Sequence, residues 1–190
     1  LGQRAQQYIN IQDWPNTILN LDSLRRKDPT YRVAEVDSMY YFSLRNYGYD
    51  LITKQGNLEG GIYQITLAER FGPLDNTVLQ LREGARAYVL AASYWDLDWK
   101  NAVANFATVA AGWPSMWDGT LTATERYRIA LMRYGDELYA RQQYCDAAKQ
   151  YQLSASIGPL DADSQKNANK AYAECFPPTE QIFPTPIITP

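Results

Sequence analysis

The chain has 190 residues, and its 18 lysine and arginine side chains against 21 aspartate and glutamate side chains give a net charge of −3. This weakly acidic balance argues against a nucleic-acid-binding protein, which normally shows a basic patch. The sequence contains no histidine, which excludes a Ser-His-Asp triad, a Cys-His pair and a zinc site with histidine ligands. No apolar run approaches the ~20 residues that span a bilayer.

A short pattern recurs four times along the chain. In each copy a proline follows an aromatic or apolar residue by 15 positions, in the pairs Trp14 and Pro29, Leu58 and Pro73, Trp99 and Pro114, and Tyr144 and Pro159. The four prolines are 44, 41 and 45 residues apart. A sequence period of this length is typical of helical-repeat proteins.

The segment between each aromatic or apolar residue and its proline has helical periodicity, and the proline ends the helix. A longer helical segment precedes each of these short ones. Asp13 and Asp98 stand at N-cap positions, and Thr122 with Glu125 forms a capping box. The expected helices cover residues 2–12, 15–27, 32–55, 58–71, 75–95, 99–112, 122–142, 145–157 and 161–175.

This pattern resembles the tetratricopeptide repeat (TPR) family, whose unit ends in a proline and carries small residues where its two helices cross. The last unit matches best, with Gly135, Ala147, Tyr151 and Pro159. The resemblance implies an all-α fold, a right-handed α-α superhelix (solenoid) of about four TPR-like helix pairs with a C-terminal capping helix. The observed period exceeds the family's 34 residues, and on period alone HEAT and armadillo repeats stay open.

The expected domain organisation follows from the repeat. A TPR-like domain covers residues 1–176, with units at about 1–30, 31–74, 75–115 and 120–160 and a cap at 161–175. Residues 177–190 form a tail rich in proline and threonine, which we expect to be disordered. Leu1 begins within an expected helix, so we expect a fragment whose N-terminal cap, and any anchor, lies upstream.

The two cysteines, Cys145 and Cys175, are expected to form a disulfide. Cys145 opens the short helix of the last unit, and Cys175 closes the capping helix. Because these helices run antiparallel and have similar lengths, their far ends arrive level. A disulfide implies an oxidising compartment, and the tail resembles spacers of exported bacterial surface proteins, so we expect an extracytoplasmic or cell-surface location. The alternative is two unpaired, half-buried thiols.

In the TPR architecture the first helix of each pair lines a concave groove. The candidate partner-binding residues lie beside the core stripe of these helices: Asn46, Asp50, Thr53, Ala87, Ala91, Tyr94, Met132, Asp136 and Tyr139. This set is small and aromatic in the middle with polar and acidic flanks, which suits an extended peptide or a partner helix. It contains no cluster of lysine and arginine, so a clamp for a free C-terminal carboxylate is not expected.

The sequence therefore predicts a non-catalytic scaffold that binds a protein or peptide, with no cofactor, metal, nucleic acid or membrane insertion by this segment. Asp96 and Asp98 form a close acidic pair, which we interpret as helix capping rather than as glycosidase carboxylates. The alternative function is an extracellular glycan-binding module that uses exposed aromatic side chains, among them the run Met39-Tyr40-Tyr41-Phe42. The oligomeric state, and whether the concave or the convex face binds, stay open.

Overall fold

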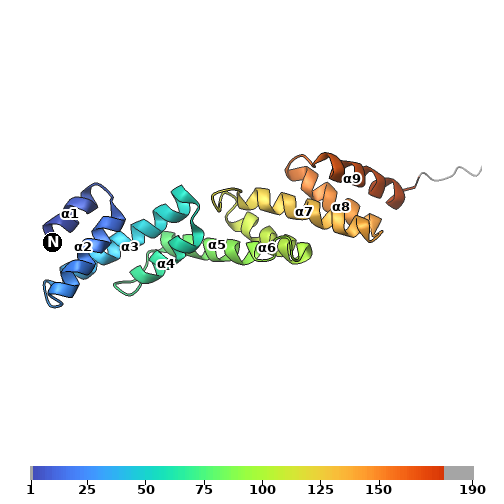
Figure 1. Ribbon diagram of the computed structural model, residues 1–190. Helices are drawn as coiled ribbons and strands as arrows, with labels where there is room; N and C mark the ends of the chain where they lie inside the picture. Colours follow the sequence, from blue (N-terminus) through green and yellow to red (C-terminus); the bar gives the residue numbers. More distant parts are fainter. Residues whose placement is uncertain (1, 178–190) are drawn as a thin grey trace, which may run out of the picture. The chain divides into compact units, whose positions relative to one another are not determined.

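The computed structural model describes residues 2–177 and is all-α in that range (Figure 1). Each described helix begins and ends within three residues of its expected range. The predicted tail lies outside the described residues, apart from Pro177. The helices are α1 Gly2–Asn10, α2 Trp14–Lys27, α3 Val33–Gln55, α4 Leu58–Ala68, α5 Asn76–Ala92, α6 Trp99–Gly112, α7 Ala123–Ala140, α8 Tyr144–Ile157 and α9 Ala162–Cys175.

Local capping determines where several of these helices begin. The carboxylates of Asp13, Asp75, Asp98 and Asp161 each accept a hydrogen bond from the backbone N–H three residues further on. Each such bond satisfies a backbone donor that the first helical turn leaves free. The predicted N-caps Asp13 and Asp98 are therefore confirmed. The hydroxyl of Thr122 likewise accepts from the N–H of Glu125 at 3.2 Å.

The chain divides into two compact units, Leu1–Tyr127 and Arg128–Pro190, with the boundary inside α7. In the first unit the helices pack in consecutive pairs, α1 with α2, α3 with α4 and α5 with α6, and α2 with α3 and α4 with α5 join the pairs (Figure 1). In the second unit α8 packs against α9. The first unit has two buried apolar clusters, one with Tyr88 and Phe106 and one with Leu21 and Tyr40, and the second unit has a cluster with Tyr151.

The helices α3 and α4 approach each other backbone to backbone at two glycines. A Cβ atom on Gly48 would lie 2.8 Å from the carbonyl oxygen of Gly61, and a Cβ on Gly61 would lie 2.7 Å from that of Gly48. Both distances are shorter than any van der Waals contact, so only glycine fits at this crossing. The resemblance to TPR units led us to expect a small residue where the two helices of a pair cross.

The predicted disulfide is present. Cys145 in the first turn of α8 and Cys175 at the end of α9 are bonded, with their Cα atoms 4.9 Å apart. The bond joins the two helices at the end opposite to their connection, and the alternative of two free thiols is wrong. Among residues 2–177, no helix is both long enough and apolar enough to cross a membrane.

Candidate functional site

Two of the nine predicted groove residues are buried, so the prediction is wrong for them. Ala91 is fully buried in the core of the first unit, because α5 packs against both α4 and α6. Met132 is 4% exposed, and its Sδ atom accepts a hydrogen bond from the backbone N–H of Asp161. A side chain on a core face cannot line an open groove.

Two other predicted residues, Asn46 and Asp50, are occupied by contacts within the first unit. The side-chain amide of Asn46 donates to the carbonyl oxygen of Phe42 at 2.7 Å. The carboxylate of Asp50 accepts from the indole N–H of Trp14 at 3.0 Å and pairs with Lys54 at 2.9 Å. The Asp50 contact joins α3 to α2, whereas the Asn46 contact stays within one turn of α3.

The remaining three predicted residues of the first unit are Thr53, Ala87 and Tyr94. Ala87 and Tyr94 are half-buried, and Thr53 is exposed. Thr53 lines an apolar groove of about 310 Å³ together with Ile52, Leu81 and the loop 113–117, which contributes two tryptophans. We call this the tryptophan groove. The structure therefore brings only one member of the predicted set to a described cavity.

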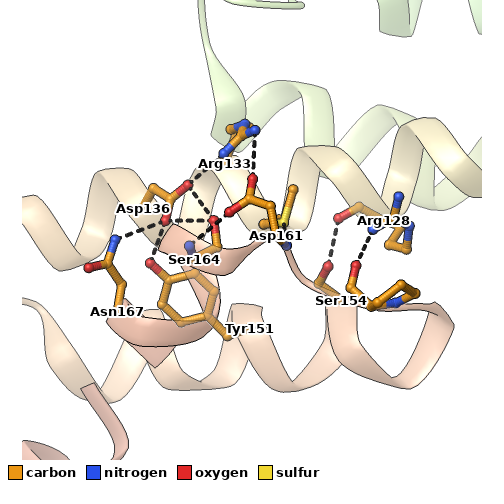
Figure 2. Close-up of polar contacts among 10 residues, drawn as sticks. Arg128, Arg133, Asp136, Tyr151, Ser154, Asp161, Ser164 and Asn167 are labelled. Atoms are coloured by element: carbon orange, nitrogen blue, oxygen red, sulfur yellow. Dashed lines mark hydrogen bonds and ion pairs between the residues drawn. The ribbon is translucent and has the colours of Figure 1, made fainter. Parts of the chain in front are cut away.

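In the second unit, Asp136 is the centre of a polar cluster (Figure 2). Its carboxylate accepts hydrogen bonds from the Tyr151 hydroxyl at 2.7 Å, the Ser164 hydroxyl at 2.9 Å and the Asn167 amide at 3.3 Å, and it pairs with Arg133 at 3.1 Å. We call these five residues the Asp136 cluster. Because its members come from α7, α8 and α9, the cluster fastens the three helices together.

Residues of this cluster and the nearby Tyr139 make further contacts within the second unit. Arg133 also pairs with Asp161, the N-cap of α9, at 2.9 Å (Figure 2). Burial and the hydrogen bond to Asp136 both raise the pKa of Tyr151, so its hydroxyl stays protonated and donates. The ring of the last predicted residue, Tyr139, packs edge-on against Tyr144. The carboxylate of Asp136 is thus occupied by hydrogen bonds and an ion pair that stabilise the second unit.

A second groove of the first unit was not predicted, and it has a more varied lining. It has a volume of about 430 Å³ and lies over α2, α3 and the α4 region. We call it the tyrosine groove, and its lining residues are Ile18, Asp22, Arg25, Tyr40, Leu44, Tyr63, Gln64, Leu67, Arg70 and Phe71.

The aromatic side chains of the tyrosine groove range from buried to exposed. Tyr40 is 6% exposed, stacks on Phe71 with ring centroids 4.8 Å apart, and donates its hydroxyl to Asp22 at 2.8 Å. Burial, followed by the hydrogen bond to Asp22, raises the pKa of Tyr40. Tyr63 is 60% exposed and Phe71 is 36% exposed. The groove therefore has an aromatic floor formed by the stacked Tyr40 and Phe71 rings and an exposed tyrosine, Tyr63, at its surface.

One signal in the sequence could have identified this groove. The buried face of α4 consists of Leu58, Gly61, Ile65 and Ala68, at helical spacing. Tyr63 lies off this face and is exposed, so it is an aromatic residue that the core of the repeat does not need. We overlooked it because the resemblance to TPR units directs attention to the first helix of each pair, and α4 is a second helix.

Over residues 2–177, no group of three or more cysteine, aspartate or glutamate side chains is placed to hold a metal ion. The comparisons with known proteins found no matching family model, no matching curated protein and no matching solved structure.

Proposed function

We propose that this chain is a non-catalytic, TPR-like scaffold that binds a segment of a partner protein in the tyrosine groove. The observation that supports the proposal is the lining of that groove. Apolar side chains from three helix regions converge there, and the large aromatic side chain of Tyr63 is left mostly exposed at its edge. Tyrosine is enriched at protein interfaces because one rigid side chain supplies both apolar area and a polar tip.

The groove also has the dimensions of a peptide site. A volume of about 430 Å³ lies within the range of about 300–1,000 Å³ that is usual for ligand pockets, and the stacked Tyr40 and Phe71 rings give it a preformed floor. A preformed site reduces the ordering cost that a partner must overcome on binding. The tryptophan groove of the same unit offers a second, purely apolar surface.

We also propose an extracytoplasmic location for the scaffold. The support is the disulfide between Cys145 and Cys175, since disulfides persist in oxidising compartments and are rare in the cytosol. Localisation of a tagged full-length protein in the native organism tests this point.

The binding proposal is tested by selection from a library of random 12-residue peptides displayed on phage. Wild-type protein should enrich clones whose binding is lost on a Tyr63→Ala variant. Leu97→Ala is the matched control, because Leu97 is 84% exposed but lines neither groove; the clones should bind it as they bind wild type. A selection in which no enriched clone depends on Tyr63 would contradict the proposal.

A second candidate function is glycan binding, and the exposed Tyr63 ring is the observation that favours it. Gln64 and Asp22, whose planar polar side chains can hydrogen-bond to sugar hydroxyls, line the same groove. A glycan array probed with wild type and with Tyr63→Ala distinguishes the two functions. Glycan signals that disappear with the variant would support this candidate, and an array without signals above background would remove it.

A further inference from the structure

The charged side chains of the tyrosine groove differ in how they are paired. Arg25 on α2 is fully engaged: its guanidinium pairs with Asp37 at 2.6 Å and donates to the carbonyl oxygen of Pro29 at 2.9 Å. Asp22 accepts the hydroxyl hydrogen bond from Tyr40. Each of these two groups therefore has its role in the fold.

Arg70 is different. Its side chain is exposed and lines the groove just after the end of α4. Within residues 2–177, its guanidinium takes part in no ion pair and no side-chain hydrogen bond, whereas the neighbouring Glu69 is taken by Arg82 at 2.7 Å. An arginine presents several N–H donors in a planar fork, so Arg70 offers this groove a cation with unused hydrogen-bonding capacity.

The charge of the lining reinforces this asymmetry. Two arginines and one aspartate line the groove. The charge of Arg25 is already balanced by Asp37, so Arg70 supplies the cation that the groove can offer to a ligand.

We propose that the segment bound in the tyrosine groove carries an aspartate or glutamate side chain next to an apolar or aromatic one. This inference rests on the proposed peptide-binding function and adds the chemistry of the partner. The apolar side chain packs on the exposed rings of Tyr63 and Phe71, and the carboxylate pairs with Arg70. A guanidinium and a carboxylate form two parallel hydrogen bonds, which fixes orientation as well as charge.

The exposure of Arg70 sets how much peptide affinity its substitution should change. A charge at the rim of an interface changes association rate and salt dependence more than it changes total affinity. We therefore expect Arg70→Gln to weaken a groove-dependent acidic peptide roughly three- to tenfold at low salt, with a smaller effect at high salt.

The test uses the displayed 12-residue library, with every peptide fused at its C-terminal end so that no free carboxylate terminus is present. Parallel selections use wild type, Arg70→Gln and the control Arg86→Gln, an exposed arginine of α5 outside the groove. Clones that need Tyr63 should be enriched in aspartate and glutamate over the input library with wild type and Arg86→Gln, but not with Arg70→Gln. A synthetic copy of the strongest clone with its acids changed to glutamine should then bind wild type and Arg70→Gln equally.

Two contrary outcomes are distinguishable. Clones that need Tyr63 but show no acidic enrichment would overturn the partner chemistry while the proposed function stands. If no clone needs Tyr63, both the function and this inference fail. Circular dichroism of Arg70→Gln checks that the variant is folded, which we expect because the side chain has no partner within the described chain.

Discussion

The two units contain the same tyrosine–aspartate contact in two different settings. In the first unit the Tyr40 hydroxyl donates to Asp22 at 2.8 Å, and in the second the Tyr151 hydroxyl donates to Asp136 at 2.7 Å. Burial is the main cause that raises the pKa of both tyrosines. Asp136 additionally accepts from Ser164 and Asn167 on α9, whereas Asp22 accepts no other side-chain hydrogen bond from residues 2–177.

This difference shows that one type of contact can join a third helix in one unit and support the lining of a groove in the other. Where a further helix supplies donors, as α9 does for Asp136, the aspartate fastens that helix. Where no further described side chain donates, as at Asp22, the contact fixes part of the lining of a groove. We therefore expect substitutions in the Asp136 cluster to change stability and those at the edge of the tyrosine groove to change binding.

The largest stability effect should come from the disulfide. Changing Cys145 and Cys175 together to Ser removes a cross-link between residues 30 apart in sequence, which the chain-entropy relation values at about 3–4 kcal/mol. All five tryptophans precede residue 128, so tryptophan fluorescence follows the first unit and circular dichroism follows both. The urea midpoint should fall in circular dichroism and stay constant in fluorescence. Equal shifts of the two midpoints would contradict independent unfolding of the two units. As a control, a reductant should leave the urea midpoints of the variant unchanged, because it has no disulfide.

The next largest effect should come from Asp136→Ala. The variant leaves the buried hydroxyls of Tyr151 and Ser164 without their acceptor, which should cost the second unit about 2–3 kcal/mol. Hydrogen exchange of backbone amides in residues 128–177 should accelerate, with residues 2–127 unaffected. Asp146→Ala is the matched control, because Asp146 forms only an exposed pair with Lys149; its effect should stay within about 0.5 kcal/mol. Equal exchange in the two variants would refute a special role for the cluster.

A smaller effect should appear in acid. The hydrogen bond from the backbone N–H of Ser164, together with the nearby Arg133, holds the pKa of Asp161 below its usual value. A carboxylate with a lowered folded-state pKa contributes stability above about pH 4, and this contribution is lost as pH falls through the folded pKa. Asp161→Asn keeps a capping side chain that does not titrate. Its urea midpoint should therefore fall less than that of wild type between pH 5 and pH 2.5, and parallel profiles would contradict the assignment.

The smallest stability effects should be those of Tyr63→Ala and Arg70→Gln. Both side chains are mostly exposed, so each change should alter the unfolding free energy of the first unit by less than about 0.5 kcal/mol. Tyr40→Phe provides the contrast within the same groove, because it removes a partly buried hydrogen bond and should cost about 1 kcal/mol. Tryptophan fluorescence in urea measures all three variants. A loss at Tyr63 as large as that at Tyr40 would show that the groove edge is structural.

Helix ends and the disulfide could be predicted from the sequence, whereas the exposure of individual side chains where several helices meet could not. Asp13, Asp98 and the repeated prolines determine helix ends locally, and the matched lengths of α8 and α9 were sufficient to predict the disulfide. The periodicity of α5 identifies one buried face, but it does not reveal that a second neighbour covers Ala91. For the same reason the exposure of Tyr63 depends on how the neighbouring helices pack around α4. The sequence pattern of α4 alone does not contain that information.

The disulfide also has a mechanical consequence. Force applied to the chain beyond Cys175 passes through the sulfur atoms directly to the first turn of α8, so that the rest of α8, α9 and the connection between them carry no tension. The shielded stretch spans 30 residues, or about 100 Å of chain at full extension. In a single-molecule pulling experiment with handles on the two ends of the protein, addition of a reductant should lengthen the fully unfolded chain by that amount.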